Sequence, residues 1–253
     1  MDLGVRSLIY KDRFRFQIAA DATALAEAAV DLLVSMVRRT LTQKDRFLLA
    51  IPGGATPARF LELLASRADL PWERIWIFWT DERFVPHDHP DSNYGLAART
   101  LLSKVNPRFY PVQTGLANPC LTVIDYTRAL HEAFGLQPGQ TPIFDLIILG
   151  MGTDGHIASL MPYCYALVEE LGPVCTVWMP DGSCRISLTS QVLRAADRIA
   201  LLISGQHKAK VLADVLSHRP DPLRYPVHIL WPVLDKVVWM VDHQAAALLD
   251  VNY

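Results

Sequence analysis

Cysteine is scarce in this sequence and lacks the spacing of a metal-binding or disulfide-rich domain. The four cysteines are Cys120, Cys164, Cys175 and Cys184, and no two form a CxxC pair. This spacing excludes a zinc finger and a compact disulfide framework. Reduced thiols are typical of a reducing compartment, so the sequence predicts a cytoplasmic protein.

Long apolar runs and an excess of either charge are also absent. No stretch reaches the ~18 continuous apolar residues of a membrane span. Residues 1–10 carry Asp2 and Arg6 and lack the apolar run of a signal peptide. The net charge is −2, the pI is about 6.4, and the chain has no basic stripe. We therefore expect neither a membrane nor a nucleic-acid partner.

Hydrophobic residues make up 51% of the 253 residues, which is ample for one full core. No repeat, low-complexity tract or clear linker divides the chain, so we expect a single domain over residues 1–253 and a monomer. Predicted strands alternate with predicted helices throughout; the helices include one capped by Asp21, one capped by Asp91 or Ser92 that runs through Leu102, and one over 243–249, whereas residues 166–174 are ambiguous. The strands are expected at 14–18, 47–51, 74–79, 146–149, 174–179, 185–189, 198–203 and 237–241. This alternation predicts an α/β fold with a mainly parallel sheet covered on both faces.

One stretch combines a buried strand, a glycine-rich turn and two groups that can move protons. The apolar run 146–149 leads into Gly-Met-Gly-Thr-Asp-Gly-His (150–156), where Asp154 and His156 stand at the start of an expected helix. The glycine spacing also matches the dinucleotide-binding fingerprint, which requires a long helix after the third glycine. Pro162 would stop such a helix after about two turns, so we set the nucleotide interpretation aside.

A second turn, Pro-Gly-Gly-Ala-Thr-Pro (52–57), follows the strand predicted at 47–51. Thr56 is expected as the N-cap and Pro57 as the first residue of a helix. Gly53, Gly54 and Thr56 would then expose backbone N–H groups at a helix N-terminus, where an anion is favoured. The alternative is an ordinary strand-to-helix turn without a ligand.

A third cluster, Asp81-Glu82-Arg83, directly follows the strand predicted at 74–79. Ionisable groups after a buried strand need partners or a cleft. Downstream, His87, Asp88 and His89 could suggest a metal site. We set that interpretation aside because no third ligand lies at a supporting spacing.

Four strand ends therefore carry polar clusters, and one parallel sheet would bring them together. They are Gly53-Gly54-Thr56, Asp81-Glu82-Arg83, Asp154-His156 and Gly205-Lys208. In such sheets the ligand sits beyond the carboxyl ends of the strands. We expect a shared site there.

At these clusters the sequence resembles the glucosamine-6-phosphate isomerase/6-phosphogluconolactonase family, on its lactonase side. The matching segments are Pro-Gly-Gly-Ala-Thr-Pro (52–57), Trp-Thr-Asp-Glu-Arg-Phe-Val-Pro (79–86), Asp-Ser-Asn-Tyr (91–94), Gly-Met-Gly-Thr-Asp-Gly-His-Ile-Ala-Ser-Leu (150–160), Arg-Ile-Ser-Leu-Thr (185–189) and Ser-Gly-Gln-His-Lys-Ala (204–209). The resemblance implies a Rossmann-like three-layer α/β/α fold. It also implies hydrolysis of 6-phospho-glucono-1,5-lactone in the oxidative pentose phosphate pathway, without a metal or nucleotide cofactor.

The resemblance also assigns residue roles. His156 would be the general base that activates water, and Asp154 or Asp81 could orient it. Gly53, Gly54, Thr56, Arg83 and Lys208 would lie around the sugar phosphate, with Arg185 as a further phosphate candidate. Which of the cationic groups holds the phosphate and which stabilises an oxyanion stays open.

The sequence departs from the family pattern between residues 153 and 184. Thr153 replaces a usual proline, Met161-Pro162-Tyr163 replaces a frequent Phe-Pro-Gly, and 163–184 match poorly. Ser159 is expected in a helix or a cap and not as a nucleophile.

The sequence also bears on two alternative functions. Sister deaminases of glucosamine 6-phosphate carry a glutamate where Met161 stands and Asp-Glu-Tyr where Asp81-Glu82-Arg83 stand. Both differences favour the lactonase. A non-catalytic sugar-phosphate sensor with DNA-binding activity would need a helix-turn-helix module, and the ~45 residues before the first motif already read as core strand and helix.

Overall fold

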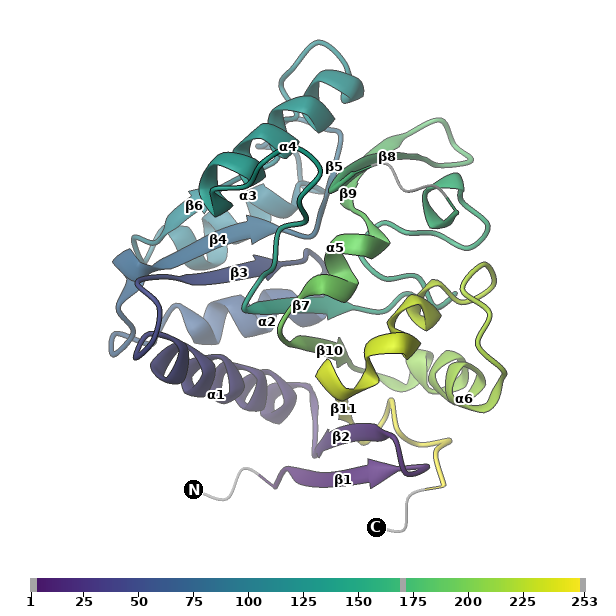
Figure 1. Cartoon of the computed structure of the whole chain (residues 1–253). Helices are drawn as coiled ribbons and strands as arrows, with labels where there is room; N and C mark the ends of the chain where they lie inside the picture. Colours follow the sequence, from purple (N-terminus) through teal and green to yellow (C-terminus); the bar gives the residue numbers. More distant parts are fainter. Residues whose placement is uncertain (1–3, 169–171, 251–253) are drawn as a thin grey trace.

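A computed structural model of the chain describes residues 4–168 and 172–250, in which a central sheet carries helices on both faces (Figure 1). Within these residues the larger sheet has eight strands in the order β1-β2-β11-β10-β7-β3-β4-β6. Its strands are β1 (Arg6–Tyr10), β2 (Phe14–Ala19), β3 (Phe47–Ile51), β4 (Ile75–Trp79), β6 (Arg108–Tyr110), β7 (Leu146–Gly150), β10 (Ile199–Ile203) and β11 (Val237–Asp242). Only β1 pairs antiparallel in this sheet, so the predicted α/β fold with a mainly parallel sheet is confirmed.

The helices form the outer two layers. One face carries α1 (Ala22–Thr40), α2 (Ala55–Leu64) and α3 (Asn93–Ala97), which continues into the π-helical turn η2 (Ala98–Leu102). The other face carries α4 (Pro119–Phe134), α5 (Ser190–Ala195) and the long 3-10 segment η5 (Pro226–Lys236). The remaining helices are η1 (Trp72–Arg74), η3 (Tyr165–Leu167), η4 (Gln206–Lys208) and α6 (Ala209–Ser217). None of the helices in the described part of the chain has the length and hydropathy to cross a membrane.

The chain reverses its winding direction between β3 and β7, which pair in parallel. From β3 the chain crosses through α2 to β4, whereas from β7 it proceeds through α5 to β10 on the other side. The loops that leave the carboxyl ends of β3 and β7 therefore diverge. Such a reversal opens a crevice in which doubly wound sheets bind ligands.

A second, smaller sheet was not predicted as a separate unit. Strands β5 (Asp81–Arg83), β9 (Cys184–Leu188) and β8 (Val174–Trp178) pair antiparallel beside the main sheet. The pairing of β5 with β9 sets Asp81 opposite Ser187 and Arg83 opposite Arg185. The small sheet thus brings residues about 100 positions apart to one edge of the crevice.

A local sequence signal explains the start of α1. Asp21 is the predicted N-cap of α1, and its carboxylate accepts from the backbone N–H groups of Thr23 and Ala24.

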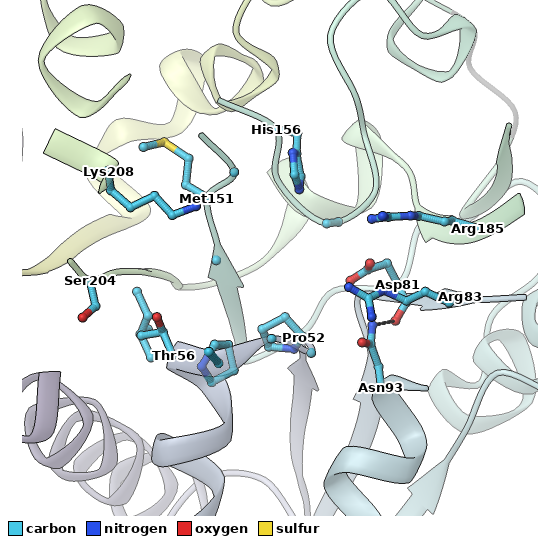
Figure 2. Close-up of a pocket in the computed structure, with 18 of the residues that line it drawn as sticks. Pro52, Thr56, Asp81, Arg83, Asn93, Met151, His156, Arg185, Ser204 and Lys208 are labelled. Carbon is cyan, nitrogen blue, oxygen red and sulfur yellow. Dashed lines mark hydrogen bonds between the residues drawn. The ribbon is translucent and has the colours of Figure 1, made fainter. Parts of the chain in front are cut away.

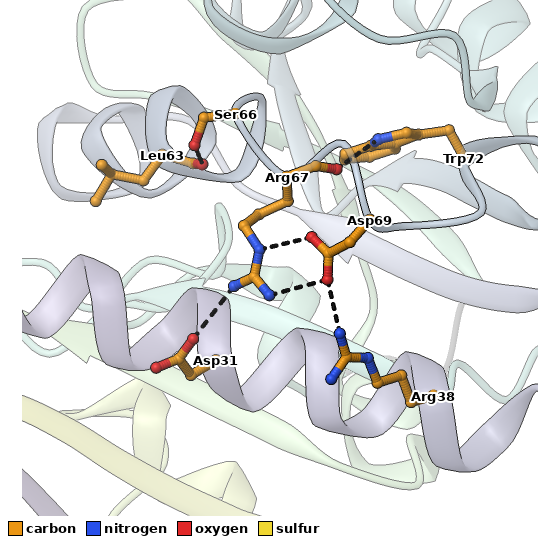
Figure 3. A network of polar contacts seen from close by, with 7 residues as sticks. All are labelled: Asp31, Arg38, Leu63, Ser66, Arg67, Asp69 and Trp72. Carbon is orange, nitrogen blue, oxygen red and sulfur yellow. Dashed lines mark hydrogen bonds and ion pairs between the residues drawn. The ribbon is translucent and has the colours of Figure 1, made fainter. Parts of the chain in front are cut away.

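An ion-pair network joins the turn after α2 to α1. Arg67 bridges Asp31 and Asp69, and Asp69 also accepts from Arg38 (Figure 3). The hydrogen bond from Arg67 lowers the pKa of Asp69 to about 2. Exposed pairs of this kind contribute only about 0–1 kcal/mol each.

Three local predictions are wrong. The helix α2 begins at Ala55 with Gly54 as its N-cap, so Thr56 is not the cap and Pro57 is not the first helical residue. Gly54 adopts φ of +104°, which lets the chain enter the helix earlier than a Thr cap would allow. The helix expected over 243–249 is a series of turns: after the bond from Ala246 N–H to the Asp242 carbonyl, Ala247 and Leu249 donate only three residues back, to Gln244 and Ala246.

The helix expected after the glycine-rich turn is also absent from residues 156–163. Gly152 N–H donates to the carbonyl of His156, which closes a tight loop. Ala158 and Tyr163 then adopt positive φ values of 49° and 59°, which interrupt a right-handed helix. Of the ambiguous segment 166–174, residues 169–171 lie outside the described residues.

Candidate active site

A pocket of about 280 Å³ lies at the carboxyl ends of the parallel strands, where the winding direction reverses. Figure 2 shows side chains from the ends of several strands lining it. The predicted residues among its walls are Gly53, Gly54, Thr56, Asp81, Arg83, His156, Arg185 and Lys208. The structure therefore confirms the prediction that the four strand-end clusters lie close together. Asp154, Glu82 and Gly205 are not among the lining residues.

His156 and Asp154 form a hydrogen-bonded pair on the loop after β7. Nδ1 of His156 lies 2.6 Å from Oδ1 of Asp154, which also accepts from the His156 backbone N–H at 3.1 Å. Burial opposes ionisation of Asp154, but the hydrogen bond and charge of His156 outweigh it and lower the pKa of Asp154 to about 2. An ionised carboxylate only accepts, so Nδ1 carries a proton and Nε2 of neutral His156 keeps its lone pair. The sequence left Asp154 and Asp81 as alternative partners, and the geometry selects Asp154.

Glycine is required at two points of this site because side chains approach it closely. A Cβ at Gly152 would lie 2.1 Å from Nδ1 of His156, and one at Gly53 would lie 1.8 Å from Oδ1 of Asn93. Asn93 in turn donates from Nδ2 to the backbone carbonyl of Asp81 at 2.8 Å. The glycines thus let β3, β5 and β7 deliver their ends to one small space.

The N-terminus of α2 opens into the pocket beside Lys208. The first backbone N–H groups of a helix lack intrahelical acceptors, and here the residues that present them, Gly54 to Thr56, line the pocket. Lys208 is half-buried, and burial lowers the pKa of its ammonium while the nearby Asp154 opposes this change. In Figure 2 Lys208, Ser204 and Thr56 lie together on one side of the pocket. A helix N-terminus and an ammonium group together favour an anion at that side.

Arg83 and Arg185 lie together on the opposite side of the pocket (Figure 2). Burial, and next the charge of Arg83, lower the pKa of Arg185. Nη1 of Arg83 donates to the carbonyl of Asp91 at 2.7 Å, and its Nε is buried without a partner among the described residues. Neither guanidinium forms an ion pair with a carboxylate of the described chain. Two adjacent guanidinium groups without a directly paired carboxylate favour electron-rich oxygen atoms of a ligand.

Within the cluster Asp81-Glu82-Arg83, Glu82 has a structural role. The fully buried carboxylate accepts from the backbone N–H groups of Arg83, Asn93 and Tyr94 and from the hydroxyl of Ser92. Burial raises the pKa of Glu82, and these backbone donors partly offset the effect. The role of Glu82 is to fold the 83–92 loop back onto the start of α3.

No part in the site was predicted for four residues that shape it: Asn93, Ser159, Ser204 and Asp242. Asp242, at the end of β11, accepts from Ser204 Oγ at 2.5 Å and from the N–H of Gly205 at 3.0 Å. It thereby fixes the turn that presents Lys208. An acid at the end of a buried strand was the available signal for Asp242, but its partners Ser204 and Gly205 lie 38 and 37 positions away.

Tyr163 shows how the chain accommodates its departure from the family pattern. It stands where the pattern often has glycine, and it keeps the left-handed backbone, with φ of 59°. Its N–H donates to the carbonyl of Leu223, and its side chain is exposed.

In the loop after β5, Nε2 of His87 contacts the carbonyl of Val112, so His87 has a partner within the protein.

Fold and site together define an α/β protein with a pocket lined by cationic side chains at the switch point of a doubly wound sheet. Comparison with known proteins then specifies the family. Residues 20–239 match the family described as glucosamine-6-phosphate isomerases/6-phosphogluconolactonase, and the chain belongs to it. The predicted family resemblance is confirmed.

Several relatives carry the name of one branch of this family. The chain is 35% identical to a 6-phosphogluconolactonase of Nostoc sp. over 238 residues, which cover 93% of this chain and 98% of the relative. It is 35% identical to a 6-phosphogluconolactonase of Homo sapiens over 222 residues, or 83% of each chain. A crystal structure of 6-phosphogluconolactonase from Thermotoga maritima has a TM-score of 0.77 at 28% identity, covering 90% of this chain and 98% of that chain.

The fold alone does not separate the two activities of the family. A monomeric glucosamine-6-phosphate deaminase has a TM-score of 0.78 at 18% identity, covering 92% of this chain and 99% of that chain. At that identity the likeness shows the fold only. The distinction between lactonase and deaminase therefore depends on particular side chains.

Proposed function

We propose that this chain hydrolyses 6-phospho-glucono-1,5-lactone to 6-phosphogluconate. The observation that carries the proposal is the pair His156–Asp154, joined at 2.6 Å, in a pocket with cationic groups on two sides. A phosphorylated lactone has one phosphate to hold and one carbonyl oxygen that gains negative charge. The relatives named 6-phosphogluconolactonase support the same substrate.

In the proposed mechanism His156 acts as a general base. Nε2 takes a proton from water as the water oxygen attacks the lactone carbonyl carbon, and Asp154 stabilises the imidazolium that forms. The bond between that carbon and the ring oxygen then breaks, and His156 returns the proton to the departing oxygen. No covalent nucleophile is needed, because the lactone is already reactive.

In this proposal the cationic groups bind different parts of the substrate. Lys208 and the N–H groups at the start of α2 hold the phosphate. Arg83 and Arg185, on the other side of His156 in Figure 2, stabilise the carbonyl oxygen as it becomes an oxyanion. Asp81 accepts a hydrogen bond from a sugar hydroxyl. The reaction as proposed uses one chain, folded as a single domain, and no metal or nucleotide.

An assay of two reactions tests the proposal. The purified protein should accelerate loss of 6-phosphogluconolactone well above spontaneous hydrolysis and should release no ammonia from glucosamine 6-phosphate. Met161 stands where the sister deaminases carry glutamate, and Arg83 where they carry tyrosine. Ammonia release at a rate comparable to lactone hydrolysis would reverse the assignment.

A further inference from the structure

Ser159 lies in the same glycine-rich stretch as His156 but does not line the pocket. Its side chain is fully buried, and its hydroxyl donates to Oδ2 of Asp81 at 2.7 Å. The sequence predicted a helix or a cap for this residue, and the structure places it in neither. A buried hydroxyl without access to the pocket is also excluded as a nucleophile.

Asp81 receives a second donor from its neighbour in sequence. Thr80 Oγ1 lies 3.0 Å from Oδ1, so each carboxylate oxygen of Asp81 accepts one hydroxyl of the protein. A carboxylate offers about four acceptor positions, so about two remain for a ligand. Asp81 as a residue is only 6% exposed, and it is one of the residues that line the pocket.

The backbone around this contact is fixed as well. Ser187, opposite Asp81 in the small sheet, accepts from the N–H of Ser159 at 3.2 Å, and its own hydroxyl donates to the carbonyl of Leu188. Ser159 and Ser187 thus belong to one network, are equally buried, and each donates one hydrogen bond from its hydroxyl. Of the two serines, only Ser159 contacts the Asp81 carboxylate through its side chain.

We infer that Ser159 is a positioning residue that aims the Asp81 carboxylate at a ring hydroxyl of the bound sugar lactone. The inference rests on the proposed function, because it states that Ser159 helps to position the substrate of that reaction. The hydroxyls of Thr80 and Ser159 hold the Asp81 carboxylate in one orientation, so that it serves as a fixed acceptor. Misplacing such a group by about 1 Å can cost about 100-fold in rate.

The serine pair supplies a matched experiment. Ser159→Ala should lower kcat/KM for the lactone by about 10–100-fold, whereas Ser187→Ala should leave it within about threefold. Both variants lose a buried hydrogen bond, so both should lose a few degrees of melting temperature. Equal effects of the two substitutions on kcat/KM would overturn the inference, because that result would indicate a purely structural role for Ser159.

A double-mutant cycle tests whether Ser159 acts through Asp81. In an Asp81→Ala background, Ser159→Ala should change kcat/KM by less than about twofold, because the group it positions is gone. Asp81→Leu, which fills more of the buried volume, replaces Asp81→Ala if the alanine variant does not fold. An undiminished effect of Ser159→Ala in either background would refute the inference.

The parent protein separates this inference from the proposed function. A parent that hydrolyses the lactone, combined with an additive cycle, contradicts the role of Ser159 alone. A parent that does not accelerate lactone loss contradicts the proposed function and this inference with it.

Discussion

At the scale of single residues, the site separates a proton-transfer pair from the charges that surround it. His156 and Asp154 are adjacent on one loop, whereas Arg83, Arg185 and Lys208 come from three other parts of the chain. This arrangement allows the base and the ligand-holding groups to be tested independently.

Replacing His156 with asparagine should lower kcat about 10²–10⁴-fold, which is the usual contribution of a general base. The spontaneous hydrolysis of the lactone must be subtracted before the rates are compared. His89→Asn, the same change at a loop histidine outside the pocket, is the control and should keep the parent kcat. A folded His156→Asn protein with kcat within a few-fold of the parent would exclude the general-base role.

The pH profile of the parent should have a single acid limb. Activity falls on acidification because protonated His156 cannot accept a proton from water. Asp154 adds no second limb, since its pKa of about 2 keeps it ionised throughout the working range. A slope of two on the acid side of log kcat/KM against pH would contradict this assignment.

Lys208→Ala should mainly raise KM, because the ammonium binds the phosphate equally in the ground and transition states. Steady-state kinetics with phosphorylated and unphosphorylated gluconolactone measure the effect. Lys210→Ala is the control, since Lys210 is exposed and pairs only with Asp214 among the described residues. Equal turnover of both lactones by the parent would remove this role from Lys208.

At the scale of elements, the loop that carries His156 depends on η5. Val227 N–H donates to the carbonyl of Gly155, and Tyr225 packs against the same glycine. Nearby, the buried ring of His228 accepts at Nδ1 from the N–H of Asp221 and donates from Nε2 to the carbonyl of Val215. These contacts join η5 to α6 and to the turn between them.

Burial lowers the pKa of His228, and its backbone hydrogen bonds only partly oppose this effect. The folded pKa therefore lies below the unfolded value of about 6.5. His228 contributes stability fully above pH ~6.5, and this contribution is lost as the pH falls below that value, because the unfolded chain binds the proton first. Denaturant unfolding at pH 7.5 and 5.5 should show the loss.

His228→Gln should unfold at lower denaturant than the parent but lose less stability between the two pH values. His218→Gln, at an exposed histidine of the same region, should keep the parent's difference. If His228→Gln and the parent lose stability equally on acidification, His228 is not the titrating group.

At the scale of the whole molecule, we predict a monomer. The proposed mechanism uses side chains of one copy of the chain only. Light scattering coupled to size exclusion should give a mass near 28.3 kDa. A stable dimer at micromolar concentration would contradict the prediction. The expected lack of nucleic-acid and membrane partners also stays a prediction.

Local patterns in the sequence predicted the buried strands and the capped helices, because each depends on neighbouring residues. The apolar runs at 47–51, 146–149 and 198–203 form β3, β7 and β10. Ser92, one of two predicted caps, accepts from Gly95 N–H at the start of α3. The edge strands β1 and β6 were missed because they are short and partly exposed, so their hydrophobic pattern is weak.

The sequence by itself determined the residues that carry charge and chemistry, from His156 to Lys208, and the order of strands and helices that delivers them. Tertiary structure alone decided which of them touch. Asp154 is the partner of His156, Asp81 is held by Ser159, 78 positions away, and Arg83 faces Arg185 across an antiparallel pair. Hydrophobic burial sets the strand positions through local pattern, whereas a hydrogen bond between distant side chains requires both strand ends to be placed within about 3 Å. That placement follows from sheet order and register, which no short stretch of sequence encodes.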